Sequence, residues 1–394
     1  MKKQIYMIAY TNYPSDARVR REAETLAATG DFEVAFLSLQ DNDTAKSYEL
    51  ENVKVIELDV KKYRGHNKFN HMKSYLKFLL LAFCQCNRQF FARKLDIVHV
   101  HNMPNFLVLA GLLPRLCGKK MILDIHDSTP ETYFAKYGKN ANKLLFKLLC
   151  WEEACCCGLA NKIICVNHVQ RDELIGRGIS SKKIAISMNV PDPKWFGMNG
   201  IPKHNKPDKT IKMIYHGTIA KRLGIDLAIR AFARICPKDS GMEFHILGNG
   251  EGIDECMELS SLLDLDDHVH FINKMLPLES LLEILRDMDV GIVANRENAA
   301  TELMLPVKLL EYIALNIPVV VPRLKAIEHY FTDDMVSYFE PENIDSLAQA
   351  ILNLFNDEHR RKSQAEKAKT FLDRYGWEKH KLDLINLYRE VTGK

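Results

Sequence analysis

Short apolar runs alternate with amphipathic helical patterns along nearly the whole chain, and this alternation constrains the fold more than any other feature. The run at residues 5–10, for example, is followed by a helical pattern over 17–30, which ends at a glycine, Gly30. Strand–helix alternation is typical of parallel sheets covered by helices on both faces. The other runs lie at 32–39, 53–60, 96–101, 120–127 and 161–167, and then at 211–217, 243–250, 268–273, 289–295, 318–322 and 335–340.

The runs fall into two series separated by a segment of different composition. Residues 191–210 are rich in Pro, Gly and Lys and show no hydrophobic periodicity, which is typical of a linker. We therefore predict an α/β chain of two doubly wound, Rossmann-like domains, residues 1–195 and 211–372, with a linker at 196–210. A length of 394 residues suffices for two domains of ordinary size.

Composition argues against several classes of protein. No run of 18 apolar residues occurs, and the first residues lead directly into the apolar run at 5–10 rather than into a secretory leader. The ten cysteines form no CxxC pair, which argues against a zinc knuckle or a disulfide framework and favours a reducing, cytoplasmic compartment. The 54 basic and 51 acidic residues divide unevenly: residues 1–200 carry 29 and 20, whereas residues 201–394 carry 25 and 31.

Ligands of open α/β sheets bind at the carboxyl ends of the strands, so the loops after the strands are the places to search. The first of these loops, residues 11–18, contains no glycine, which argues against a dinucleotide-binding enzyme of the GxGxxG type. Its Ser15 and Asp16 fit two roles equally well, capping of the helix that follows or contact with a ligand.

The first loop of the second half combines glycines with cations. Gly217 and Gly224 flank Lys221 and Arg222, an arrangement that suits a diphosphate as well as a solvated basic loop. The next loop carries a Gly-x-Gly at 248–250, which a tight turn explains adequately.

The most informative single segment is residues 302–322. Pro306 predicts the start of a short helix and Asn316 its end, before a buried strand. Lys308 then falls in the first helical turn, where the helix dipole disfavours a cation by up to roughly 1 kcal/mol, and Glu311 follows on the same face. A phosphate bound at the helix N-terminus would explain the lysine, and Glu311 would then accept hydrogen bonds from a ribose. The alternative is a surface Lys–Glu pair.

Histidines mark two strands of the first half. His126 and Asp127 come just past a strand end, where His126 suits either a catalytic role or that of a buried structural histidine. His99 and His101 alternate with valine and therefore point to one face, as metal ligands would. Because no further ligand is evident near them in the sequence, we predict no metal site.

Taken together, several segments resemble the retaining GT-B glycosyltransferases of the large group 1 (family 4-like) type, which move a sugar from a nucleoside diphosphate donor. The match covers nearly the whole chain, and the order and spacing of its segments carry it. The resemblance implies two domains facing across a cleft, the first binding the acceptor and the second the donor, and a final helix at 373–394 that crosses back to the first domain. The segments are YPSDARVRREAETLAATG, DIVHVHN, LDIHDSTPE, LANKIICVN, YHG with RLGID, HILGNGE with HVHFINK, DVGIVAN and PVKLLEYIALNIPVVVP.

The resemblance also implies roles for residues of the donor domain. Glu311 matches the second glutamate of the family's E-x7-E motif, which binds the donor ribose, whereas Leu303 replaces the first and the adjacent Glu302 is out of register. Arg222, with Lys221, stands in for basic residues that relatives carry nearby. The other donor residues implied are Gly217, Thr218, Gly248, Asn273 and Lys274, with Leu305, Pro306, Val307 and Lys308 around the diphosphate.

In the acceptor domain, the resemblance places His126 near the donor sugar as the catalytic group, and we expect Pro14, Asp16, Asn102 and Asp127 to contact the acceptor. It implies retention by front-face attack, a nucleoside diphosphate-sugar (a UDP-sugar first) as substrate, and neither cofactor nor metal ion. The expected acceptor is a glycan or a lipid-linked sugar in surface polysaccharide or glycoconjugate synthesis.

Residues 61–94 contain nine Lys or Arg and no Asp or Glu, interleaved with apolar side chains. This pattern predicts either a basic amphipathic surface that meets the inner face of the membrane or an ordinary helix packed on the sheet. We expect no nucleic-acid partner, because no known binding module is present and the second half is acidic. The alternative function is that of a non-catalytic nucleotide-sugar-binding relative, suggested by Leu303.

Overall fold

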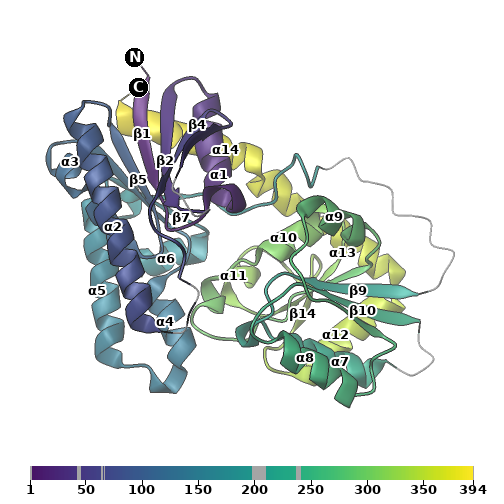
Figure 1. Cartoon of the computed structure of the whole chain (residues 1–394). Coiled ribbons are helices and arrows are strands. Elements are labelled where there is room, and N and C mark those ends of the chain that lie inside the picture. Colours follow the sequence, from purple (N-terminus) through teal and green to yellow (C-terminus); the bar gives the residue numbers. More distant parts are fainter. Residues whose placement is uncertain are drawn as a thin grey trace. The chain divides into compact units, whose positions relative to one another are not determined.

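The computed structural model describes residues 2–41, 46–63, 65, 67–197, 210–236 and 241–393. They form two compact units, which are coloured along the chain in Figure 1. Unit 1 comprises Met1–Asn189 and Glu378–Lys394, and unit 2 comprises Val190–Trp377. No helix in the described part of the chain combines the length and the apolar character that crossing a membrane requires.

Unit 1 is built on an eight-stranded sheet in the order β3-β4-β2-β1-β5-β6-β7-β8. Neighbouring strands are parallel except at one edge, where β3 runs antiparallel to β4. The strands are β1 (Lys3–Ile8), β2 (Phe32–Leu39), β3 (Ser47–Leu50), β4 (Val53–Leu58), β5 (Ile97–His101), β6 (Lys120–Ile125), β7 (Lys162–Cys165) and β8 (Ile184–Ile186). The six predicted runs of the first half are all strands, and β3 and β8 are additional.

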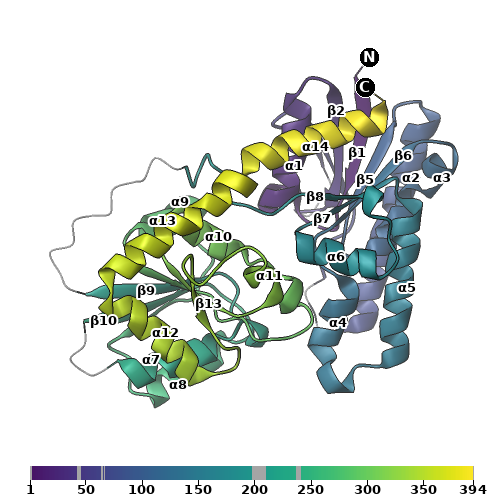
Figure 2. The same ribbon diagram turned by 180° about the vertical axis from the view of Figure 1, so that it is seen from behind.

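Helices cover both faces of this sheet. One core cluster joins the strands to α2 and α5 through side chains such as Phe78 and Cys156, and a second joins the other face to α1 and α14 through Leu26 and Tyr388. Figure 2 shows α14 crossing the strands of unit 1. The helices of the unit are α1 (Ala17–Ala28), α2 (Lys68–Phe91), α3 (Leu112–Leu116), α4 (Thr129–Tyr137), α5 (Lys143–Leu159), α6 (His168–Gly176) and, apart from its first residue, α14 (Trp377–Thr392).

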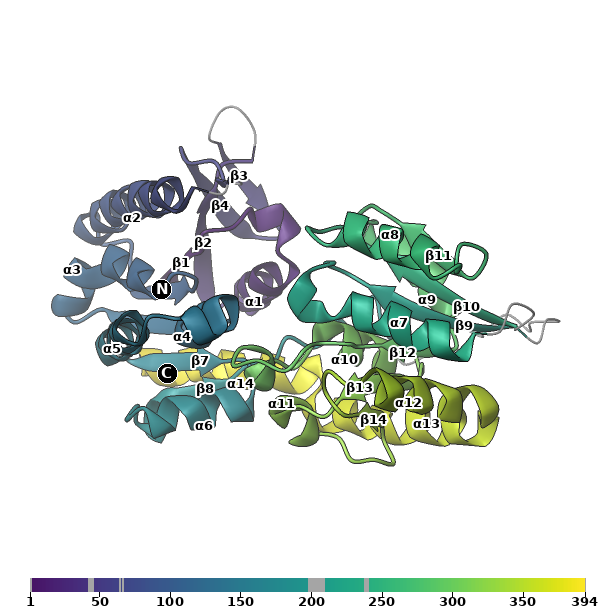
Figure 3. The same ribbon diagram turned by 90° about the horizontal axis from the view of Figure 1, so that it is seen from below.

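Unit 2 is built on a six-stranded parallel sheet in the order β11-β10-β9-β12-β13-β14. Its strands are β9 (Ile211–His216), β10 (Met242–Leu247), β11 (Val269–Ile272), β12 (Val290–Ile292), β13 (Val319–Pro322) and β14 (Ser337–Phe339). Its helices are α7 (Ile225–Ile235), α8 (Ile253–Leu262), α9 (Leu278–Arg286), α10 (Val307–Ala314), α11 (Lys325–Glu328), α12 (Ile344–Asn356) and α13 (Glu358–Tyr375). Helices α7, α8 and α12 bury their apolar faces on one side of the sheet, as Figure 3 shows.

The division between the units differs from the predicted one. Most of the predicted linker, residues 198–209, lies outside the described residues. Unit 1 ends at Asn189 rather than at 195, because Phe196 packs with Leu282 and Ala314 of unit 2. The predicted final segment, 373–394, begins within α13, which continues to Tyr375. The helix proper starts at Trp377, and its residues from Glu378 onward belong to unit 1.

Both sheets reverse their strand order beside the first strand. In unit 1 the reversal lies between β1 and β5, and in unit 2 it lies between β9 and β12. Open α/β sheets bind ligands at such a switch point, outside the carboxyl ends of the strands. The loops after these four strands are therefore where the fold places a functional site.

Candidate functional site

Two glycine loops pack against each other at the switch point of unit 2. Gly217 follows β9 with a φ of +109°, and Gly248 follows β10 with a φ of +139°. A Cβ on Gly248 would lie 1.8 Å from the Gly217 carbonyl oxygen, and one on Gly250 would lie 2.1 Å from that of Ile219. The glycines are required by close backbone approach as well as by the turn, so the tight-turn explanation was incomplete.

Lys308 lies beside this loop, in the first turn of α10, as predicted. Its Nζ is buried, has no hydrogen-bond partner among the described residues, and lies 3.5 Å from the centre of the Tyr215 ring. A Cβ on Gly217 would lie 3.5 Å from the same nitrogen. Burial lowers the pKa of Lys308 to about 7, because removal from water disfavours the charged ammonium. A buried, unpaired cation at a helix N-terminus is a site prepared for an anion.

Glu311 is held by the strand and not by Lys308, so the surface Lys–Glu pair is wrong. Its Oε2 lies 2.7 Å from Nε2 of His216, the last residue of β9. On the other side of the ring, His216 Nδ1 lies 2.9 Å from the Tyr312 hydroxyl. With the proton on Nε2, His216 donates to Glu311 and accepts from Tyr312. We did not predict His216 as a functional residue, although its place directly before Gly217 could have indicated it.

The two cations of the loop after β9 lie at the protein surface. Lys221 and Arg222 occupy a short 3₁₀ turn, and both are exposed. Arg296 holds the backbone of this turn with two hydrogen bonds. Its Nε donates to the carbonyl oxygen of Lys221 (3.0 Å), and its backbone N–H donates to the carbonyl oxygen of Arg222 (3.0 Å). Arg296 itself pairs with Asp226 (2.5 Å). The loop is therefore fixed while its two cations remain accessible to a ligand.

The other predicted donor residues lie after β9, after β11 and at the start of α10. Asn273 follows β11, and its Oδ1 accepts from Asn249 Nδ2 (2.9 Å). Glu302 does not take the place of the glutamate absent at Leu303, because its Oε2 accepts from the backbone N–H of Lys325 (3.0 Å). Thr218 is exposed, Pro306 is the buried N-cap of α10, and Lys274, Leu305 and Val307 lie at the surface or half-buried.

In unit 1, His126 follows β6 and is partly exposed. Its Nε2 lies 2.9 Å from Asp124 Oδ2. Asn102 holds the turn, because its Oδ1 accepts from the His126 N–H (2.8 Å) and its Nδ2 donates to the Asp127 carbonyl (2.7 Å). The Asn102 amide, predicted to contact an acceptor, is thus buried and engaged within the protein. The exposed Asp127 side chain keeps its carboxylate available.

In the loop after β1, one of the predicted residues caps the following helix and another lies at the surface. Asp16 accepts from the Val19 N–H (3.4 Å) and caps α1, whereas Pro14 is exposed. Two residues of α1 that we did not predict, Arg18 and Glu22, are buried, and Arg18 donates to Asp124 (2.8 Å). Burial raises the pKa of Asp124, but Arg18 and the neighbouring histidines outweigh it and hold that pKa well below its usual range.

Two units of Rossmann strand order, one with a buried cation and glycine loops beside its switch point, are typical of two-domain nucleotide-binding proteins. A family model described as glycosyl transferases group 1 matches residues 199–371, and one described as glycosyltransferase family 4 matches residues 17–193. The chain belongs to the group 1 glycosyltransferases and has their GT-B fold.

Relatives and solved structures agree with this assignment. The chain is 27% identical over 307 residues (75% of this chain, 77% of the relative) to the N-acetylgalactosamine-N,N'-diacetylbacillosaminyl-diphospho-undecaprenol 4-alpha-N-acetylgalactosaminyltransferase of Campylobacter jejuni. It is 21% identical over 360 residues (89% and 88%) to an uncharacterised glycosyltransferase of Methanocaldococcus jannaschii. Among solved structures, sucrose-phosphate synthase of Thermosynechococcus elongatus superposes with a TM-score of 0.80 (16% identity, 100% of each chain). Anabaena HepE in complex with UDP and glucose superposes with a TM-score of 0.68 (12% identity, 99% of each chain).

Proposed function

We propose that this chain transfers a hexose from a UDP-sugar, with retention, to a hydroxyl of a glycan or lipid-linked acceptor in surface polysaccharide or glycoconjugate synthesis. The observation that carries the donor half of this proposal is Lys308, a buried cation without a partner at the N-terminus of α10. A nucleoside diphosphate supplies the anion that this position lacks.

The donor site neutralises a diphosphate without a metal ion in this proposal. The first N–H groups of α10 point out of the helix start and, with Lys308, face the leaving group. Arg222 and Lys221 on the accessible turn add charge from the other side of the loop. Such preorganised donors stabilise the negative charge that develops as the sugar–phosphate bond breaks. Glu311, fixed by His216, accepts from the ribose hydroxyls.

We assign His126 as the polar group nearest the transferred sugar, as the family resemblance implies. Nε2 of His126 is engaged by Asp124, so Nδ1 is the ring nitrogen that we assign to the ligand. Asp124 itself is fully buried and paired with Arg18, so it is unsuited to attack an anomeric carbon. Direct attack by the acceptor hydroxyl on the same face, with departure of the diphosphate, is the mechanism that fits this arrangement.

The names of relatives support the choice of substrates. The Campylobacter enzyme acts, by its name, on a sugar linked through a diphosphate to undecaprenol, and HepE is seen with UDP. A UDP-sugar donor and a lipid-linked acceptor are therefore the first to be tried with this chain.

A lipid-linked acceptor calls for a membrane-binding surface, and we propose that α2 provides it. Its side chains Phe69, Met72, Leu76 and Leu80 form an exposed apolar stripe beside a shallow groove of about 490 Å³. The opposite face, with Phe78, packs into the core. The prediction of a helix packed on the sheet holds for one face of α2. For the exposed face we propose the other predicted role, contact with anionic lipid.

Helix α5 extends this surface with a second stripe. Leu144, Leu148 and Trp151 are exposed at i, i+4 and i+7 spacing, with Lys143 and Lys147 beside them. Helices α2 and α5 belong to the same core cluster and cover the same face of the sheet. Helix α2 carries Lys and Arg but no Asp or Glu, and Lys143 and Lys147 flank the exposed stripe of α5. This positive charge disfavours a second copy of this chain as the partner and favours an anionic bilayer.

The function is tested by UDP release. Thermal shift with UDP-, GDP-, ADP- and CMP-linked sugars identifies the donor, and we expect UDP-sugars to raise the melting temperature most. The selected donor is then mixed with a polyprenyl-diphosphate-linked sugar, and UDP and the glycolipid product are measured. Acceptor-dependent UDP release supports transfer. Binding of the sugar nucleotide without release under any acceptor would establish the non-catalytic relative that Leu303 suggests.

A further inference from the structure

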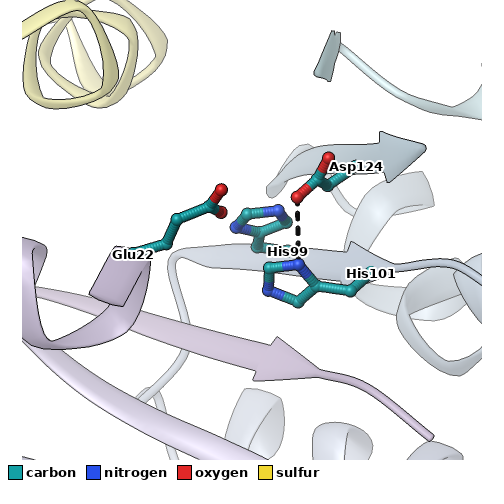
Figure 4. Close-up of side chains that lie close together, drawn as sticks. All are labelled: Glu22, His99, His101 and Asp124. Atoms are coloured by element: carbon teal, nitrogen blue, oxygen red, sulfur yellow. Dashed lines mark hydrogen bonds and ion pairs between the residues drawn. The ribbon is translucent and has the colours of Figure 1, made fainter. Parts of the chain in front are cut away.

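A second cluster of chemically active side chains lies in unit 1, apart from the donor site. It comprises Glu22 of α1, His99 and His101 of β5, and Asp124 of β6, which converge in Figure 4. Each of the four is at most 1% exposed. One ligand atom from each residue lies within 4.8 Å of those of the other three.

The two histidines are oriented through one ring nitrogen each. His101 Nδ1 lies 3.1 Å from Asp124 Oδ2, and His99 Nδ1 lies 2.5 Å from the Tyr388 hydroxyl. The rings stack with their centres 4.1 Å apart. A histidine that ligates a metal through Nε2 almost always donates its Nδ1 proton to a carboxylate or another acceptor, as His101 does here to Asp124.

The cluster contains buried nitrogen and oxygen atoms that no hydrogen bond within the described part of the chain engages and that a cation could bind. Nε2 of His99, Nε2 of His101 and Oε2 of Glu22 are buried, and none has a hydrogen-bond partner among the described residues. Buried polar atoms are almost always paired, because an unpaired one costs about 1–3 kcal/mol. Three such atoms on residues of one cluster point to a ligand that binds there.

The charges of the cluster allow a divalent cation. Asp124 is neutralised by Arg18 at 2.8 Å. Arg18 approaches Glu22 only through the other carboxylate oxygen, Oε1, at 3.5 Å. One carboxylate and two imidazoles then remain, and both ligand types bind zinc in proteins. Zinc holds its ligand atoms roughly 3.3 Å apart, so the side chains, whose ligand atoms lie within 4.8 Å of one another, rotate toward the ion when it binds.

We propose that Glu22, His99 and His101 bind one divalent transition-metal ion, zinc by ligand type, with Asp124 orienting His101. The site is closed to solvent, which suits a structural ion and not a catalytic one. The ion links α1 to β5 directly, and through Asp124 and Tyr388 it braces β6 and α14. It is separate from the diphosphate site of unit 2, which binds its anion through Lys308 and α10.

The chain offers a matched control in a second group of similar composition. Glu243, His245 and His270 of unit 2 are half-buried, and His245 Nε2 is already occupied by Glu243 at 2.9 Å. Half-exposed groups with internal partners gain less from a metal ion than buried groups without one. We therefore expect His245→Gln to leave tight metal binding unchanged.

Metal content of the full-length, tag-free chain tests the proposal. The protein is stripped with a chelator, incubated with zinc or cobalt, passed through a desalting column and analysed by mass spectrometry for metal. We expect about one ion per chain in the wild type and in His245→Gln, and loss of that ion in Glu22→Gln. Bound cobalt should give visible bands that differ from those of the aqueous ion, and zinc should raise the melting temperature of the stripped wild type.

Two results would overturn the proposal. One is a wild-type chain that retains no zinc or cobalt and whose melting temperature zinc does not change, which would show that water or a proton on Glu22 fills the cluster. The other is an unchanged stoichiometry in Glu22→Gln. If Glu22→Gln fails to fold, Glu22→Asp replaces it, and a shifted cobalt spectrum supports the site whereas an unaltered one contradicts it.

Discussion

Lys308 places its ammonium nitrogen 3.5 Å from the centre of the Tyr215 ring, buried and without a hydrogen-bond partner among the described residues. The ring face offers a partial substitute for water, but a cation–π contact does not replace three hydrogen bonds. Burial of the Lys308 ammonium therefore lowers the free energy of unfolding of the free protein, and a bound anion removes this penalty.

Substitution of Lys308 by methionine should stabilise the protein and abolish donor binding. Removing a buried cation whose pKa has fallen to about 7 should raise the free energy of unfolding by on the order of 3 kcal/mol near neutral pH. Denaturant unfolding measures the gain and calorimetry the loss of UDP affinity. The control is Lys221→Met, an exposed cation, which should weaken UDP only modestly and leave stability unchanged. A destabilised Lys308→Met that still binds UDP would contradict the assignment.

UDP affinity should depend on pH through Lys308. Below pH 7 the lysine is charged before UDP arrives, so affinity does not vary through this group; above pH 7 binding must take up a proton. Since the terminal phosphate of UDP titrates near pH 6, a change in UDP affinity above pH 7 arises from a group of the protein. The dissociation constant should rise by up to about tenfold per pH unit from pH 7 upward. Titration calorimetry in buffers of different ionisation enthalpy measures the proton, and Lys308→Met should show none.

Glu311 should discriminate a nucleotide from a bare diphosphate. Glu311→Ala removes the acceptor for the ribose hydroxyls and should weaken UDP about 10- to 100-fold, while inorganic pyrophosphate binds as before. His216→Gln, which frees Glu311 from its 2.7 Å contact, should give a smaller loss in the same direction. Equal losses for UDP and pyrophosphate would place Glu311 at the phosphates instead.

Gly248→Ala should disrupt the donor loops. Its Cβ would meet the Gly217 carbonyl at 1.8 Å, and its φ of +139° is unfavourable for alanine. We expect a loss of about 2–4 kcal/mol in stability and of UDP binding. Gly158→Ala in α5, where a Cβ meets nothing within 4 Å, is the matched control and should be neutral or stabilising by up to about 1 kcal/mol. Thermal melts of both variants make the comparison.

The exposed stripe of α2 should govern binding to anionic vesicles. Leu76→Glu with Leu80→Glu places charge on the surface that we assign to the bilayer, and co-sedimentation with vesicles rich in phosphatidylglycerol should fall several-fold. Leu262→Glu, on the exposed end of α8 in unit 2, is the control and should bind vesicles like the wild type. Equal sedimentation of all three proteins would refute the membrane surface.

The sequence predicted the strands well because buried parallel strands are continuous apolar runs. It missed β3, whose SYEL sequence is short, half-exposed and paired only at an edge, where burial imposes little pattern. Asp16 as the cap of α1 and Asn316, with its φ of +60°, as the end of α10 were confirmed because both depend on local backbone geometry.

The sequence alone predicts the position of Lys308 in its helix, but it does not predict the contacts that bury Lys308, Arg18 and Glu22. The position of Lys308 in a first helical turn follows from Pro306 alone, whereas its burial against Tyr215 depends on a strand some ninety residues earlier. Arg18 and Glu22 lie in a highly charged helix and resemble solvated residues in the sequence. Arg18 is buried against Asp124, 106 residues away, and Glu22 lies beside Arg18, which no local pattern reveals.

A crystal structure of this chain with UDP tests the central claim most directly. We predict a β-phosphate oxygen within hydrogen-bond distance of Lys308 Nζ and of the first N–H groups of α10, with the ribose hydroxyls on Glu311. UDP bound elsewhere, or bound in unit 2 while the Lys308 ammonium remains over Tyr215 without a phosphate contact, would contradict the account.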